Sequence, residues 1–254
     1  MLRVERPSHR GLRLDPAELL DGELELLGLL PAASNYTFLA RLGTPPKGRR
    51  RGPPAADERL VVYKPRKGEA PLWDFPSGTL CLRESAAFLV SRAAGFGFVP
   101  ATVLRDGPLG LGSVQSFVDH DFRCSAFDLL PEHAGALRGI ALFDLVVNNA
   151  DRKAGHVFPD AAGRVWAVDH GICFHAEHKL RTVLWDFCGE PIEEAERACL
   201  RRLEAALDAD LATALGDLLD PVELEALRRR LEVVLAARVF PEPGPGRSFP
   251  WPPV

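Results

Sequence analysis

The stretch NNADRKAGH at residues 148–156, followed by AVDHG at residues 167–171, decides the fold and site that we expect. Asp151 comes just after an apolar segment with helical spacing, and Asp169 ends a short apolar strand before a glycine. Phosphoryl transfer from a nucleotide uses such a pair, because one carboxylate orients or deprotonates the acceptor and the other holds the metal that bridges the phosphates. The two acids therefore make a nucleotide site the first hypothesis.

The composition is that of an ordinary globular protein with room for a sizeable core. The chain has 254 residues, of which 46% are hydrophobic and 26% charged, and its formal net charge is −4 at pH 7. That charge argues against a general nucleic-acid surface. Basic character is concentrated in KGRRR at residues 47–51, where we expect a solvated loop, with contact to anionic lipid as the minor alternative.

The cysteines and the apolar runs indicate the compartment. The five cysteines are odd in number and scattered, which argues against a disulfide framework or a structural zinc site and favours a reducing compartment. We see neither an apolar signal core nor a stretch long enough to span a membrane. We therefore expect a cytoplasmic protein with no integral membrane segment. Its 26 arginines against 5 lysines suggest a GC-rich bacterial source.

The hydrophobic periodicity divides the chain into a strand-rich front half and a helical back half. In the front half it predicts a helix over 15–30, paired strands at 36–42 and 60–64, a helix over 80–94, and a hairpin of 101–105 with 112–118. In the back half it predicts helices over 131–147, 191–216 and 221–238, and a short hairpin around 160–163. Residues 43–58 are expected to form a loop.

This pattern predicts an α+β protein of two lobes with a nucleotide cleft between them. Residues 1–118 would form a small antiparallel-sheet N-lobe, and residues 119–239 a mainly helical C-lobe. The lobes would meet near residues 118–131. The proline-rich residues 240–254 are expected to be an extended tail laid over the surface.

A nucleotide site also needs a cation for the α- and β-phosphates, and Lys64 is the first candidate. It closes the apolar strand that begins at Leu60, and Glu84 on the following helix is placed to pair with it. Taken alone, a lysine at a strand end more often has its head in water, and a lone glutamate more often lies on the surface. Other motifs must decide between these interpretations.

Further motifs occur in order between residues 31 and 190. They are SNYTF (34–38), VYKPRKGEAP (62–71), WDFP (73–76), RESAAFLVS (83–91) with a Val-Pro pair at 99–100, NADR (149–152), VDHG (168–171) and LWDF (184–187). In this order they resemble the phosphatidylinositol 3-/4-kinase superfamily, closest to the type II phosphatidylinositol 4-kinases. The chain looks like an actinobacterial branch of that superfamily. The resemblance implies a two-lobed, protein-kinase-like fold.

The resemblance also implies the residues that would bind ATP. Backbone amides near Ser34 and Asn35 would cradle phosphate oxygens. Lys64 would contact the α- and β-phosphates, steadied by Glu84. The stretch that contains Gln115, Phe117 and Val118 would be the hinge that offers main-chain hydrogen bonds to adenine.

The catalytic and metal-binding residues follow from the same resemblance. Asp151 would be the catalytic base or the acid that orients the acceptor. Arg152, beside it, belongs to the same catalytic motif, and Asp144, one helical turn before Asn148, would brace the loop. Asp169 would bind the metal, Mg²⁺ or Mn²⁺.

His156 is where the chain departs from the family pattern. The family normally has asparagine five residues after the catalytic aspartate, and His156 takes that place here. Imidazole is a poorer ligand than an amide oxygen for Mg²⁺ and a better one for Mn²⁺ or Zn²⁺. The histidine would ligate a softer metal, contact phosphate as a donor, mark a weakened or inactive kinase, or simply pack in the loop.

The expected activity is ATP-dependent phosphoryl transfer to a lipid, protein or small-molecule acceptor, with the nucleotide and that acceptor as partners and no nucleic acid. One alternative is a nucleotide-binding pseudokinase that acts as a regulatory module, and another is a kinase-like enzyme that transfers AMP. A metal-dependent hydrolase centred on His170, His175 and His178 is a weaker hypothesis, because no His-x-x-x-His on a confident helix supports it.

Overall fold

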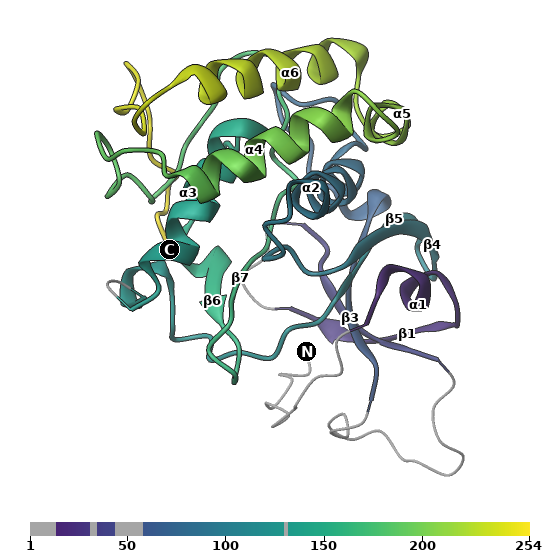
Figure 1. Cartoon of the computed structure of the whole chain (residues 1–254). Helices are drawn as coiled ribbons and strands as arrows, with labels where there is room; N and C mark the ends of the chain where they lie inside the picture. The colour runs from purple at the N-terminus through teal and green to yellow at the C-terminus, as the bar shows by residue number, and fades with distance from the viewer. Residues whose placement is uncertain (1–13, 31–34, 44–57, 130–131) are drawn as a thin grey trace.

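The structure, a computed structural model, describes residues 14–30, 35–43, 58–129 and 132–254. Within them a five-stranded sheet occupies one side of the molecule and a group of helices the other, with α2 between the two (Figure 1). The combination of an antiparallel sheet with helices confirms the predicted α+β class. The predicted phosphate-loop residue Ser34, the basic run at 47–51 and most of the predicted 43–58 loop lie outside the described residues.

The large sheet is antiparallel throughout and has the order β1-β2-β3-β5-β4. Its strands are β1 (Leu24–Leu29), β2 (Phe38–Leu42), β3 (Leu60–Pro65), β4 (Thr102–Gly107) and β5 (Gly110–Ser116). The predicted pairing of strands 36–42 and 60–64 is confirmed, and so is the hairpin of β4 with β5. Central β3 pairs with both β2 and β5, which fixes the position of Lys64 at its end.

The prediction of one helix over 15–30 is wrong beyond its first turn. Asp15 does cap a helix, accepting a 2.9 Å hydrogen bond from the Glu18 N–H, with Pro16 in the first turn. That helix, α1 (Pro16–Leu20), ends at once, and Gly22 turns the chain with φ of +90°. The leucine-rich segment that follows pairs with β2 as an edge strand, because the sheet offers partners for its backbone groups.

Helix α2 (Leu80–Ala94) connects the sheet to the helical part of the molecule. Its predicted end is confirmed, since Gly95 caps it in the left-handed conformation and donates to the carbonyls of the last turn. The helix contacts β4 and β5 on one side and α4 and α5 on the other. Eleven of its fifteen residues are buried. A glutamate on this helix can therefore face both parts of the chain.

The second half contains the remaining helices and a two-stranded sheet. They are α3 (Ala134–Val147), β6 (Val157–Pro159), β7 (Val165–Ala167), α4 (Glu194–Leu207), α5 (Leu211–Gly216) and α6 (Pro221–Ala236), with short 3₁₀ turns at Arg66–Gly68, Ala126–Asp128 and Ala154–His156. The predicted helix over 191–216 is two helices, because the chain breaks between α4 and α5 around residues 208–210. The largest hydrophobic cluster joins α2, α3, β6, β7 and the last three helices.

Residues 240–254 follow the protein surface without a helix, as predicted (Figure 1). In the described part of the chain, no helix is both long enough and apolar enough to cross a membrane.

Candidate functional site

Lys64 lies where the sheet, α2 and the second half of the chain meet. Its ammonium group forms an ion pair with Glu84 of α2 and a second one with Asp169, whose Oδ1 lies 3.0 Å from Nζ. Burial opposes the charge, but the two carboxylates more than compensate for it and raise the pKa of Lys64. The structure thus contains the expected Lys64–Glu84 pair, while the nucleotide-binding role of the two residues stays a prediction.

Glu84 ties this lysine to the segment that carries Asp169. Its side chain is only 2% exposed, and Oε2 accepts a 3.1 Å hydrogen bond from the His170 backbone N–H. Burial raises its pKa, which Lys64 opposes. Gly171 follows this segment beside α2, where an added Cβ would come into ordinary van der Waals contact with Leu80, 3.4 Å from its Cβ. The glutamate is therefore a fixed link between the two halves.

Asp169 and His156 face each other on the other side of the lysine. His156 Nε2 lies 3.3 Å from Asp169 Oδ2, and the Lys153 N–H donates to His156 Nδ1 at 3.4 Å. Burial lowers the pKa of His156 to about 4, although Asp169 opposes the shift, so the imidazole is neutral near pH 7. The Lys64 charge holds the pKa of Asp169 below its usual range. Since Nδ1 accepts from Lys153, the neutral ring carries its proton on Nε2, beside Asp169, and a cation bound between the two side chains would require that proton to leave Nε2.

These two side chains fit the metal that the resemblance implies. Nε2 and Oδ2 lie 3.3 Å apart, so both atoms could contact one cation once the Nε2 proton is lost. One imidazole and one carboxylate favour Mn²⁺ over Mg²⁺. No group of three or more His, Cys, Asp or Glu residues able to hold a metal occurs among the described residues. A bound nucleotide would have to supply further oxygen ligands.

Asp151 lies beside this group, with its side chain 30% exposed. Lys153 Nζ lies 3.6 Å from its Oδ2, and its backbone N–H donates to Asn149 Oδ1 at 3.0 Å. Burial raises the pKa of Asp151, Lys153 opposes the shift, and the nearby charge of Asp169 adds to it. A partly exposed carboxylate with a raised pKa near a second acid is a candidate for proton transfer or for orienting a hydroxyl.

A buried network of hydrogen bonds holds the 148–156 loop in place. Arg152 donates to both oxygens of Asp144, at 2.9 and 3.0 Å, and both side chains have no exposed surface. Arg152 also donates to the Val168 carbonyl at 2.8 Å, and Asn149 Nδ2 donates to Asp144 at 3.0 Å. The network binds α3, the loop and the Asp169 segment into one unit.

This burial changes the role predicted for Arg152. Its side chain cannot contact a substrate, so it positions the loop together with Asp144, for which bracing was predicted. The sequence could not reveal this, because an arginine in a loop is usually exposed. The sequence did contain one signal: Asp144, one helical turn before the loop, is an acid that could pair with a buried Arg152.

The other histidines have separate neighbours. His170 is fully buried, with Nε2 2.7 Å from Arg152 Nη2, and burial and the Arg152 charge lower its pKa. His175 packs edge-on against Phe75, with ring centroids 5.2 Å apart. The structure therefore does not bring His170 and His175 together around one ion.

For the residues predicted to bind the phosphates and the adenine, the structure shows contacts with other parts of the protein. Asn35 Oδ1 accepts from the Ala70 N–H at 2.7 Å, which holds the turn before β2 against the chain that follows β3. Gln115 donates to Thr102 inside the sheet, and the Phe117 N–H donates to the Leu60 carbonyl. The Gln115 bond uses its side-chain amide and the Phe117 bond its backbone N–H, and the hinge role of this stretch stays a prediction. Val118 lies next along the chain, with its carbonyl 2.9 Å from His120 Nδ1.

Sequence comparison places the chain in a family. It is 39% identical to Protein Rv2133c of Mycobacterium tuberculosis, over 93% of this chain and 94% of that protein. The chain belongs to the Rv2133c family. The alignment covers nearly the whole of both proteins. Family membership by itself does not assign an activity to the chain. No protein-family model matches the chain.

Two more distant relatives are named as kinases. The chain is 28% identical to phosphatidylinositol 4-kinase gamma 4 of Oryza sativa over 59% of its length, and 26% identical to the Arabidopsis thaliana protein of the same name over 53%. The matched regions cover 31% and 29% of those proteins. The chain therefore resembles part of each plant protein.

Two solved structures are similar at low sequence identity. One is the Helicobacter pylori proinflammatory kinase CtkA, with a TM-score of 0.49, 12% identity, and coverage of 87% of this chain and 94% of that one. The other is a fragment of LepB from Legionella pneumophila, with a TM-score of 0.46, 11% identity, and coverage of 72% and 45%.

Proposed function

We propose that the protein is an ATP-dependent phosphotransferase with a two-lobed, kinase-like fold. The sheet with α1 and α2 would be the N-lobe, and α3 to α6 the C-lobe. The observation that carries the proposal is the position of Lys64, which meets Glu84 and Asp169 at once. In kinase-type sites a lysine on a strand, paired with a glutamate on a helix, contacts the phosphates, and an acid from another part of the chain holds the metal. Sequence similarity to the plant phosphatidylinositol 4-kinases supports the same function.

Each residue of the site has a part in this proposal. Lys64 neutralises phosphate oxygens, and Glu84 keeps its ammonium group in place. Asp169 and His156 hold the divalent cation, Mn²⁺ or Mg²⁺, which supplies charge neutralisation when bound. Asp151 orients the acceptor hydroxyl and takes its proton. The acceptor is a lipid, a protein or a small molecule, and fold alone does not decide between them.

The test is transfer of label from ATP. Purified protein is incubated with ATP labelled at the α- or the γ-phosphate, in Mg²⁺ and in Mn²⁺, with cell extract as the source of acceptor. Asp151→Ala and Asp169→Ala are the site variants, and Asp208→Ala, which removes a carboxylate that is 70% exposed on the C-cap of α4, is the matched control.

The outcomes separate the candidate functions. Transfer of γ-label that is lost in both site variants and kept in the control supports a kinase. Transfer of α-label with the same pattern would make the enzyme an AMP transferase. Thermal stabilisation by ATP without any transfer would point to a nucleotide-binding pseudokinase. A wild-type protein that binds no nucleotide would refute the proposal.

A further inference from the structure

Residues 240–254 return from the end of α6 and reach the 148–156 loop. The Ala154 N–H donates to the Pro253 carbonyl at 2.8 Å. Further back along the tail, the Ser248 carbonyl accepts from the Thr182 N–H at 3.1 Å and from the Trp185 indole N–H at 3.0 Å. The tail is therefore bonded to the loop that carries Asp151 and His156, and to the segment behind it.

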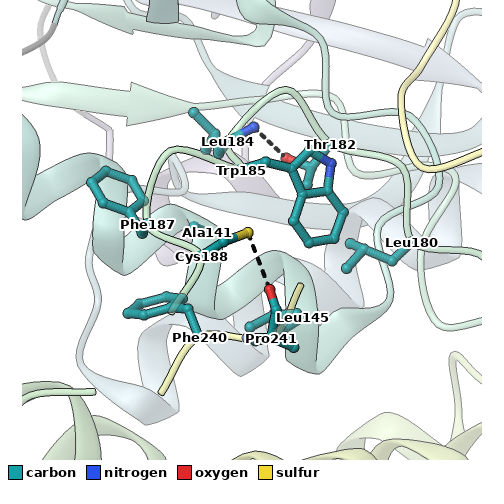
Figure 2. Close-up of a pocket in the computed structure, with 10 residues that line it drawn as sticks. All are labelled: Ala141, Leu145, Leu180, Thr182, Leu184, Trp185, Phe187, Cys188, Phe240 and Pro241. Carbon is teal, nitrogen blue, oxygen red and sulfur yellow. Dashed lines mark hydrogen bonds between the residues drawn. The ribbon is translucent and has the colours of Figure 1, made fainter. Parts of the chain in front are cut away.

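The start of the tail is anchored in the helical part of the molecule. Phe240 and Pro241 face a pocket whose other walls come from α3 and from the 180–188 segment, as Figure 2 shows. Phe240 is 4% exposed, and its backbone exchanges hydrogen bonds with Gly189 and Glu190. The Cys188 thiol donates to the Pro241 carbonyl at 3.2 Å. These contacts fix where the tail begins.

The tail also supports the loop indirectly, through residues 181–183. On one side of this segment, Thr182 donates to the tail. On the other, the Arg152 N–H donates to the Arg181 carbonyl at 2.9 Å, and the Val183 N–H donates to the Arg152 carbonyl at 3.2 Å. The segment thus lies between the tail and the loop, so displacement of the tail would free one of its two sides.

The hydrogen bond from Ala154 to Pro253 gives the Ala154 N–H a partner that the loop itself does not provide. Ala154 is fully buried and opens the 3₁₀ turn Ala154–His156, so its N–H has no acceptor within that turn. A buried N–H without a partner is costly, and the Pro253 carbonyl supplies the partner. The turn that places His156 opposite Asp169 therefore depends on the tail.

We propose that residues 240–254 are a positioning segment that holds the 148–156 loop in the arrangement that binds nucleotide. Docked, the tail fixes Asp151 and His156 relative to Asp169. Released, it leaves the loop folded but loose, and the site loses affinity for ATP with its cation. The link to ATP rests on the proposed function, whereas the effect on the loop does not.

The first variant is Ala154→Pro, made in the full chain. Proline has no N–H to donate, and its ring would collide with the Pro253 carbonyl. The site accepts proline otherwise, because Lys153 before it is extended, with φ of −89° and ψ of 159°, and position 154 begins a helical turn. Glu194→Pro is the control, since it places proline at the equivalent first position of α4, after an extended residue with φ of −69° and ψ of 159° and outside the loop.

The second variant weakens the tail from its other contact. Trp185→Phe removes the indole donor to Ser248 and keeps an aromatic ring. Trp166→Phe is the matched control, because it removes an indole hydrogen bond to Asp160 in the β6–β7 turn and leaves the tail alone. Trp185→Phe also keeps the proposal testable if Ala154→Pro fails to fold.

Amide hydrogen exchange and ATP titration in Mn²⁺ are the measurements. We expect exchange across 149–156 to rise about tenfold in Ala154→Pro and less in Trp185→Phe, with both controls unchanged. The ATP dissociation constant should rise in parallel while the unfolding temperature stays near that of the wild type, which a merely structural role would not produce.

Two results would overturn the proposal. In one, the tail amides around Ser248 exchange faster while the 149–156 amides do not. In the other, the loop loosens but ATP affinity is unchanged. If the wild type binds no nucleotide, the proposed function fails, and the exchange data alone decide whether the tail positions the loop.

Discussion

Asp144 and Asp169 are both held by cations near the same loop, yet their surroundings are opposite. Asp144 is fully buried, and both its oxygens accept from Arg152, which is also fully buried. Asp169 is half exposed, between Lys64 and His156. The first acid has no surface left for a ligand, whereas the second can exchange a protein partner for one. Burial thus separates the acid that supports the site from the acid that can act in it.

The largest loss of stability is expected where the buried pair is broken. Arg152→Met leaves Asp144 as an uncompensated buried charge, which should lower the free energy of unfolding by about 3–5 kcal/mol. Urea denaturation measures it, with Arg229→Met, an arginine 63% exposed on α6, as the control. The double variant Asp144→Leu with Arg152→Met should recover part of the loss. A single variant as stable as the control would show that the pair does not support the loop.

A smaller loss is expected at the lysine that joins the two regions. Lys64→Met removes the ionic partner of Glu84 and leaves this buried carboxylate with the His170 N–H. The free energy of unfolding should fall by about 1–3 kcal/mol. Lys67→Met, at an exposed position nearby, is the matched control for the same measurement. Equal free energies of unfolding for the two variants would show that the Lys64 charge does not stabilise the buried Glu84 carboxylate.

Asp169→Asn should cost less than about 1 kcal/mol, because the side chain is half exposed and partly solvated ion pairs contribute little. Its effect should appear in binding instead. Titration calorimetry with ATP and Mn²⁺ should show at least a tenfold loss of affinity, since a carboxylate ligand is gone. Affinity like that of the wild type would exclude Asp169 as the metal ligand.

The smallest change in stability is expected for Asp151→Asn. Burial raises the pKa of Asp151, so its charged form is less favourable in the folded than in the unfolded protein, and removing the charge should change the free energy of unfolding by no more than about 0.5 kcal/mol. Nucleotide binding should persist while γ-phosphate transfer is lost. Full transfer activity in this variant would remove Asp151 from the catalytic role.

The sequence predicts those features of the fold that local chemistry determines. The end of α2 follows from Gly95, the start of α1 from Asp15 and Pro16, and the β4–β5 hairpin from its turn. The strand at Leu24–Leu29 is missed, because its leucines suit a helix as well as a strand and only pairing with β2 decides. Periodicity also fails to show the break before α5.

In the candidate site, too, the sequence indicates some residues and cannot show the contacts that depend on the folded chain. Lys64, Glu84 and Asp169 can be picked out from the sequence because Lys64 lies at the end of a strand, Glu84 on the next helix and Asp169 just after a second strand, in the order of the family motifs. The buried position of Arg152 cannot, since it depends on α3, the loop and the Asp169 segment closing around it. The tail contact at Ala154 is invisible for the same reason: two residues far apart in the chain are joined through backbone groups, which any sequence possesses.

Asp169 has φ of +62°, a backbone conformation that costs a residue other than glycine about 1 kcal/mol. Glycine would adopt it without that strain. Asp169→Gly would relieve that strain and at the same time remove the ion pair with Lys64, so a directed-evolution screen that rewards only thermal tolerance should tolerate the substitution, whereas a screen that rewards turnover should eliminate it. Tolerance in the first selection and loss in the second would show that this carboxylate is kept for chemistry and not for stability.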